Sequence, residues 1–147
     1  MCIRDSTYPG HTACLAAGVA VQRIIAAEGL LERVRTRGPQ WRAELGARFA
    51  GLPEVGDLRG RGFFVGLELV RDPATKEPFD PALKLHERIR AEALDRGLIC
   101  YPMGGNVDGV RGDVVILAPP YNATEDDLGE IAEKLEAAVR AALAQVR

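Results

Sequence analysis

The amino-acid sequence predicts an α+β domain, with a small, mostly antiparallel sheet and helices on one face of it. The first observation is the run Phe63–Val70, which is apolar apart from Gly66 and Glu68 and reads as a largely buried central strand. The second is a set of amphipathic helical patterns before, between and after the strands. The third is the order helix–helix–strand–strand–helix–strand–strand–helix, which is typical of an α+β module.

The composition is that of an ordinary globular domain. The chain has 147 residues, 47% of them hydrophobic and 27% charged, which suits one domain or one domain plus a piece of another. The net charge of −2 without a basic block argues against nucleic acid as a partner. We find no apolar run long enough to span a bilayer and no secretory signal, so we expect no membrane partner.

The cysteines and histidines argue against a disulfide framework and a metal site. Cys2, Cys14 and Cys100 are odd in number and follow no spacing pattern, which predicts reduced thiols in a cytoplasmic protein. The chain has only two histidines, His11 and His86, and together with the cysteines they do not make a plausible set of zinc ligands.

The first six residues are excluded from the fold. Met1–Ser6 resembles the translation of a sequencing adapter, and we interpret it as a probable artefact. The native protein would then begin before Thr7.

Two helices are predicted in the first third of the chain. Thr12 can cap a helix from Ala13 to about Glu28, which has a face of small residues suited to close helix packing. A second helix runs from Leu30 to about Ala50, with a kink or a restart expected at Pro39. Its buried stripe is expected to contain Trp41, Leu45 and Phe49.

The strands and the third helix follow. We expect a short strand over Val55–Arg59, then the central strand, then an exposed loop with three prolines over Arg71–Pro81. The amphipathic helix Ala82–Arg96 comes next, with His86 solvated beside its apolar stripe.

The last third is expected to hold two more strands and a helix. The strands are Leu98–Tyr101 and Val114–Leu117, with the glycine-rich loop Pro102–Asp113 between them. Thr124 caps the final helix, and Asp127 gives an approximate capping box.

The glycines before the central strand do not form a dinucleotide-binding motif. After Gly60 and Gly62 the next glycine is Gly66, so the spacing G-x-G-x-x-G is not met. They also precede a strand, whereas that motif follows a strand and opens a helix. A tight turn that leads into a strand is the better interpretation.

Three segments together resemble the class III pyridoxal-phosphate aminotransferases, the ornithine and omega-amino-acid group. The segment Thr7–Cys14 resembles their T-Y-x-G-H-P-x-A-C motif, and Val55–Leu69 resembles V-x-D-V-R-G-x-G-x-x-x-G-I-E-L. Ala118–Glu125 resembles A-P-P-L/Y-x-x-T-E. The segments stand in the family's order and cover nearly all of Thr7–Arg147.

The resemblance implies a fold type I enzyme that acts as a homodimer, with pyridoxal 5′-phosphate as its cofactor. Residues 7–28 would be the end of the large domain and the long connecting helix, and residues 29–147 the C-terminal small domain. The family's cofactor-binding lysine lies upstream of the first motif. Lys76, Lys84 and Lys134 do not match it, so the fragment alone should be inactive and contributes no catalytic residue.

The resemblance also implies roles for individual residues. Thr7 matches the threonine that binds the cofactor phosphate of the neighbouring subunit, a role that suits a hydroxyl in a turn before a helix. His11 is expected to shape that turn, and Arg59 to hold nearby carbonyls or carboxylates. Pro119 and Pro120 end a strand in a segment that the family places near the substrate entrance.

Departures from the family predict the substrate. Family members that act on ornithine or dialkylglycine carry a carboxylate-binding arginine where Ile116 stands here, and amine–pyruvate members carry one at Tyr101. Tyr101 could donate a hydrogen bond, and Arg111 is the nearest remaining cation. We therefore expect Arg111 and Tyr101 to bind substrate, with an amine or omega-amino acid as donor and a keto acid such as pyruvate as acceptor. Arg111 as a solvated loop residue is an equal alternative.

Other functions remain open at this point. The chain could be a non-catalytic, stand-alone α+β binding or interaction module. It could also belong to an aminomutase or decarboxylase of the same family that uses the same cofactor. A lysine shortly upstream in the reading frame would favour an enzyme over a binding module.

Overall fold

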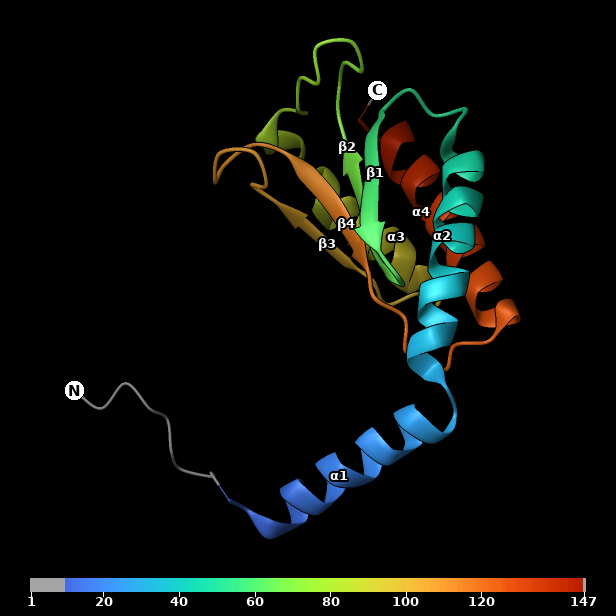
Figure 1. Ribbon diagram of the computed structural model, residues 1–147. Coiled ribbons are helices and arrows are strands. Elements are labelled where there is room, and N and C mark those ends of the chain that lie inside the picture. Colours follow the sequence, from blue (N-terminus) through green and yellow to red (C-terminus); the bar gives the residue numbers. More distant parts are fainter. Residues whose placement is uncertain (1–9, 147) are drawn as a thin grey trace, which may run out of the picture.

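The computed structural model describes residues 10–146 and confirms the predicted order of helices and strands. Thr7 and the segment Met1–Ser6 lie outside the described residues. The elements, shown in Figure 1, are α1 (Thr12–Ala27), α2 (Leu30–Phe49), β1 (Val55–Arg61), β2 (Phe64–Leu69), the 3-10 turn η1 (Pro81–Leu83), α3 (Leu85–Asp95), β3 (Tyr101–Gly104), β4 (Asp113–Leu117) and α4 (Glu125–Ala144).

The strands form one antiparallel sheet in the order β1-β2-β4-β3, which confirms the predicted small, mostly antiparallel sheet. The central strand β2 pairs with β1 on one side and with β4 on the other, so that Leu67 lies opposite both Leu58 and Val115. Helices α2, α3 and α4 cover one face of the sheet (Figure 1). This arrangement confirms the α+β class.

The core lies between the sheet and these three helices. Side chains alternate along β2, and Val65, Leu67 and Leu69 are buried on the helix side. The largest buried side chain is that of Trp41 on α2. Its Nε1–H donates to the carbonyl oxygen of Leu128 at 3.2 Å, and its ring meets Phe63 edge-on with 5.9 Å between ring centroids. Trp41 therefore links α2, α4 and the turn that leads into the central strand.

The other face of the sheet, here called the outer face, is covered by none of the helices found in residues 10–146 (Figure 1). Phe64 and Tyr101 point to this side and are 59% and 62% exposed. The fold thus buries one side of the sheet completely and leaves aromatic side chains accessible on the other.

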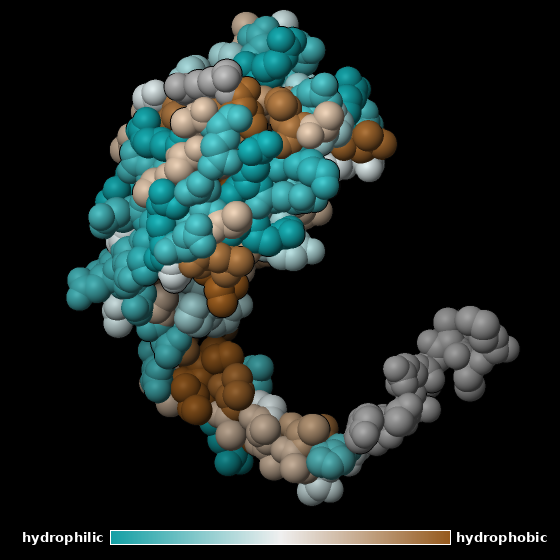
Figure 2. Space-filling model, turned by 180° about the vertical axis from the view of Figure 1, so that it is seen from behind, coloured by the Kyte–Doolittle hydropathy of each residue, from teal (hydrophilic) through white to brown (hydrophobic). Residues whose placement is uncertain are grey.

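Helix α1 projects away from the body of the molecule (Figure 1) and has no buried residue. Figure 2 shows apolar surface along it and at its junction with α2. Its N-cap is His11, whose Nδ1 accepts the Cys14 N–H at 3.4 Å, so the prediction that Thr12 caps this helix is wrong. His11 takes that place because its ring can reach back to the first turn.

No single helix in residues 10–146 has both the length and the apolar character to cross a membrane. Helices α1 and α2 would meet that test only as a pair, and they are bent by 62° at their junction.

Helix α2 runs through Pro39 without a restart, so the restart alternative is wrong. Proline lacks the N–H that would bond the Arg35 carbonyl, yet Pro39 lies on the exposed side of the helix. Buried residues on both sides of it, Leu30 and Trp41 among them, hold the helix against the body. Packing therefore outweighs the local preference of proline.

Helix α3 starts three residues later than predicted, because Lys84 adopts a left-handed conformation with φ of 49°. The Asp80 side chain accepts the Ala82 N–H and sets up the turn η1 instead. Strand β3 also begins later, at Tyr101 and not at Leu98. Gly97 has a φ of 72°, and after it the Leu98 N–H donates to the Ala93 carbonyl. This is a helix-ending motif, so the Leu98 N–H closes α3 and is not available to a strand.

His86 is not a solvated side chain, contrary to the prediction. Its Nδ1 lies 2.7 Å from Oδ1 of Asp113, a buried carboxylate that also accepts the His86 backbone N–H at 3.0 Å. The ring packs against Gly104, where a Cβ atom would approach it to 2.6 Å. The predicted loop Pro102–Asp113 is correspondingly shorter, since β3 extends to Gly104 and β4 begins at Asp113.

Candidate functional site

Tyr101, Ile116 and two residues of the Val55–Leu69 motif form one row across the outer face of the sheet. Tyr101 on β3 is opposite Ile116 on β4, Ile116 is opposite Gly66 on β2, and Gly66 is opposite Arg59 on β1. Directly opposed residues in antiparallel strands point to the same side of a sheet. The structure therefore brings Tyr101 and Ile116 together on the surface that no helix covers.

A groove of about 200 Å³ lies where these strands meet the proline-rich segment. It is apolar apart from the thiol of Cys100, whose pKa is raised by burial. The segment after β4, which contains Pro119 and Pro120, forms one wall, and the chain leading into β3 forms the other. The lining residues are Leu98, Ile99, Cys100, Leu117, Ala118, Pro119, Pro120 and Ile131.

Two arginines on α2 hold the segment between β4 and α4 in place. Arg33 donates from Nη1 to the Tyr121 carbonyl at 3.1 Å and from Nη2 to Glu125 at 3.4 Å. Arg37 donates from Nε to Glu125 at 2.5 Å and from Nη2 to Glu44 at 2.9 Å. Arg37 and then Arg33 lower the pKa of Glu125. Sequence analysis missed this contact; the available signal was the i, i+4 spacing of the two arginines.

The Arg59 side chain contacts carboxylates, as expected. Its Nη1 donates to Asp57 at 2.8 Å and to Glu68 on the neighbouring strand. Hydrogen bonds to Glu68 and then to Asp57 raise the pKa of Arg59. The Nδ2 of Asn106 also donates to Glu68 at 3.4 Å, which ties the glycine-rich loop to the outer face.

Arg111 lies at the other end of the β3–β4 hairpin from Tyr101. It stands five positions before Ile116, the partner of Tyr101, which corresponds to as much as about 17 Å along an extended strand. Its Nε donates to Oδ2 of Asp108 at 2.7 Å. The N–H of Arg111, its side chain and the N–H of Val110 lower the pKa of Asp108 to about 2. The two predicted substrate-binding residues are thus not brought together in this structure.

The model of the family described as aminotransferase class-III matches residues 4–139. The chain belongs to the class III aminotransferases.

Three similar proteins show how much of a relative the chain represents. An uncharacterized aminotransferase of Schizosaccharomyces pombe is 39% identical over 94% of the chain and 30% of its own length. A thermostable (S)-enantioselective omega-transaminase from Thermomicrobium roseum superimposes with a TM-score of 0.83 at 30% identity, over 97% of this chain and 30% of its own. A PLP-bound aminotransferase mutant from Vibrio fluvialis superimposes with a TM-score of 0.74 at 39% identity, over 84% of this chain and 25% of its own. The chain thus spans about 30% of the length of relatives it matches.

The lysines of this class III chain do not fit a covalent cofactor site. Pyridoxal phosphate is held by a lysine through a Schiff base. Lys76 donates to the Gly56 carbonyl, Lys84 is 3.4 Å from Glu87, and Lys134 is 2.6 Å from Glu130. None of the three lies in the row that contains Tyr101 and Ile116. The three lysines, all within residues 10–146, are thus engaged in other contacts and do not form a covalent anchor for the cofactor.

Proposed function

We propose that the chain is the C-terminal part of a pyridoxal-phosphate-dependent transaminase. The complete enzyme would move an amino group from an amine or omega-amino acid to a keto acid such as pyruvate. Residues 7–28 would close the large domain and connect it to the small domain, residues 29–147. The observation that carries the substrate class is the uncharged pair of Tyr101 and Ile116 on the outer face.

The physical reason lies in the charge of the substrate. A site that must hold a second carboxylate needs a fixed cation, and arginine is suited to this because its planar fork matches a carboxylate. Ile116 offers no such group, and Tyr101 offers a single hydroxyl. An uncharged amine can bind beside these side chains without leaving a buried cation unpaired.

We propose Arg111 as the group that meets the carboxylate of the keto acid. Its pair with Asp108 is exposed, so water competes with it and the guanidinium can exchange one carboxylate for another. Gly105, Gly109 and Gly112 in the same loop have positive φ, and Gly109 has open space around it. Movement of this loop over the outer face would be needed to bring Arg111 toward Tyr101.

The remaining parts of the proposal concern the complete protein. Thr7 would bind the cofactor phosphate of the neighbouring subunit in a homodimer, and the cofactor would act as electron sink when bound. The chain described here would be inactive alone, because its lysines are engaged elsewhere. The free thiols Cys14 and Cys100 support a cytoplasmic location.

The proposal is tested in the full-length protein with the cofactor bound. We expect Arg111→Ala to raise the Michaelis constant for pyruvate and to leave that for an uncharged amine donor unchanged, while Arg140→Ala, a matched exposed arginine on α4, changes neither. Thr7→Ala should weaken cofactor retention by about 1.5–3 kcal/mol, the contribution of one hydrogen bond to a charged group.

Two results would contradict the assignment. An unchanged Michaelis constant for pyruvate in Arg111→Ala would remove Arg111 from the site. Absence of amino-group transfer from any amine to pyruvate, in a protein that binds the cofactor, would favour an aminomutase or decarboxylase.

A further inference from the structure

We propose that a cleft between α2 and the β1–β2 turn, here named the cationic cleft, binds a small anion with two or more negative charges. The cleft has a volume of about 390 Å³ and lies apart from the groove beside Tyr101. It is lined by Val34, Arg35, Pro39, Arg42, Arg61 and Gly62. The ligand would be a small molecule that carries phosphate groups or several carboxylates.

The cleft exists because α2 and the turn approach each other at two glycines. A Cβ atom on Gly38 would lie 2.6 Å from the Gly62 Cα, so only glycine permits this contact. Gly62 also has a φ of 60°, which turns the chain directly after Arg61. The arginines of the helix and the arginine of the turn are thereby placed around one hollow with Val34 and Pro39 in its wall.

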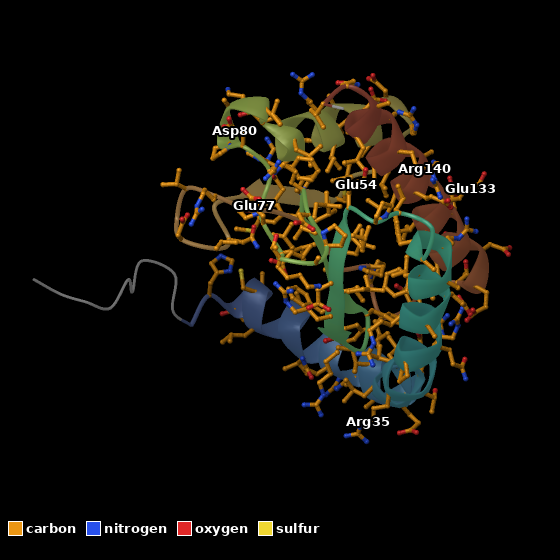
Figure 3. The ribbon with its side chains drawn as sticks, turned by 90° about the horizontal axis from the view of Figure 1, so that it is seen from above. Arg35, Glu54, Glu77, Asp80, Glu133 and Arg140 are labelled. Carbon is orange, nitrogen blue, oxygen red and sulfur yellow. The ribbon has the colours of Figure 1, made fainter. Side chains whose placement is uncertain are left out.

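One of the three arginines is held firmly. Arg42 donates from Nη1 to the Gly60 carbonyl at 2.5 Å, which fixes its guanidinium at the turn. A carbonyl does not neutralise the charge, so Arg42 stays positive toward the cleft. Arg35 has 77% of its side chain exposed, and Figure 3 shows it pointing outward from the molecule.

The positive charge of the cleft is poorly compensated. Within residues 10–146, the one ion pair formed by any of the three arginines joins Arg35 to Glu32 at 3.6 Å. Other arginines of α2 do have close carboxylates: Arg33 and Arg37 contact Glu125, and Arg48 contacts Glu136. The excess of positive charge is therefore a property of the cleft and not of α2 as a whole.

Like charges around one hollow repel each other, and a bound anion relieves this repulsion. Guanidinium groups also match phosphate and carboxylate oxygens with paired N–H donors. A ligand with a single negative charge would leave most of the excess in place. We therefore assign the cleft to anions that carry at least two charges.

Isothermal titration calorimetry of the 147-residue chain with pyrophosphate and with citrate, at constant ionic strength, tests the proposal. We expect one saturable site for at least one of the two anions. Arg61→Gln and Arg35→Gln should each weaken binding about tenfold, as expected for loss of one charged hydrogen bond. The affinity of Arg61→Lys should lie between those of the wild type and Arg61→Gln, because lysine keeps the positive charge but lacks the paired N–H donors of the guanidinium group.

Arg140→Gln is the matched control, since Arg140 is an exposed arginine on α4 (Figure 3) that is paired with Glu136. It should bind like the wild type. The absence of a saturable site for both anions, or equal weakening in Arg140→Gln and Arg61→Gln, would overturn the proposal. Circular dichroism of each variant establishes that it is folded. The titration needs neither the cofactor nor transaminase activity, so its outcome is independent of the proposed function.

Discussion

At the scale of single residues, glycines decide how closely the elements approach. Gly38 on α2 is buried against the backbone of Gly62, whereas Gly129 on α4 is exposed and has nothing within 4 Å of an added Cβ. Both are helical glycines, so their local preferences are the same. Because their surroundings differ, replacing each glycine by alanine should change stability in opposite directions.

Gly38→Ala should destabilise the protein by about 1–3 kcal/mol, because the new methyl group overlaps backbone atoms that cannot move independently. Gly129→Ala should instead stabilise it by about 0.5–1 kcal/mol, since alanine loses less backbone freedom in a helix. Urea unfolding of both variants measures the two effects. Equal stability of Gly38→Ala and wild type would show that α2 does not pack on the turn as described.

At the scale of elements, α4 is fixed by its cap at one end and by α2 along its length. The predicted capping box is confirmed: Asp127 Oδ2 accepts the Thr124 N–H at 2.7 Å, and Thr124 Oγ1 accepts the Asp127 N–H at 3.1 Å. The carboxylate of Asp127 accepts from the Thr124 N–H and, at 2.8 Å, from the Thr124 hydroxyl, and these two hydrogen bonds lower the pKa of Asp127. The cap thus couples the start of α4 to pH.

Thr124→Ala should cost about 1 kcal/mol at neutral pH, as for other helix caps. The folded-state pKa of Asp127 is depressed, so its contribution is present above the unfolded value of about 3.9 and is lost as the pH falls through the folded value. The difference between variant and wild type should therefore shrink at acid pH. Thermal unfolding at pH 7 and near pH 2 checks this, and a difference that grows toward low pH would contradict it.

At the scale of the whole molecule, α1 contacts α2 where the two helices join and buries none of its residues. Leu15 and Val19 are 59% and 50% exposed, and they line a shallow groove along the helix with Cys14 and Gly18. The body that starts at Leu30 has its own closed core. The chain should therefore fold as a domain and carry an exposed apolar helix, a surface that favours association.

We expect the 147-residue chain to self-associate, and the double substitution Leu15→Glu and Val19→Glu to suppress this by placing charges on α1. Sedimentation over a range of concentrations measures the effect. Leu94→Glu, which changes an exposed leucine on α3, is the control and should leave association unchanged. A monodisperse wild-type monomer at high concentration would refute the prediction.

The sequence by itself determined the order of the helices and strands and the buried stripe of α2, because periodicity is a local property. The order of helices and strands, the stripe Trp41–Leu45–Phe49 and the Thr124 cap could all be read from neighbouring residues. The three motifs likewise pointed to the class III family. Exact ends at Lys84 and Leu98 could not be read, since they depend on a left-handed residue and on a helix-ending hydrogen bond.

Only the tertiary structure decided which residues far apart in the chain meet. Strand order places Tyr101 beside Ile116 and sends Arg111 to the far end of the hairpin, although Tyr101 and Arg111 are close in sequence. The pairs Arg33–Tyr121 and His86–Asp113 join segments with no local pattern in common. The cationic cleft arises in the same way, because two glycines allow α2 and the turn to approach and so gather arginines from both.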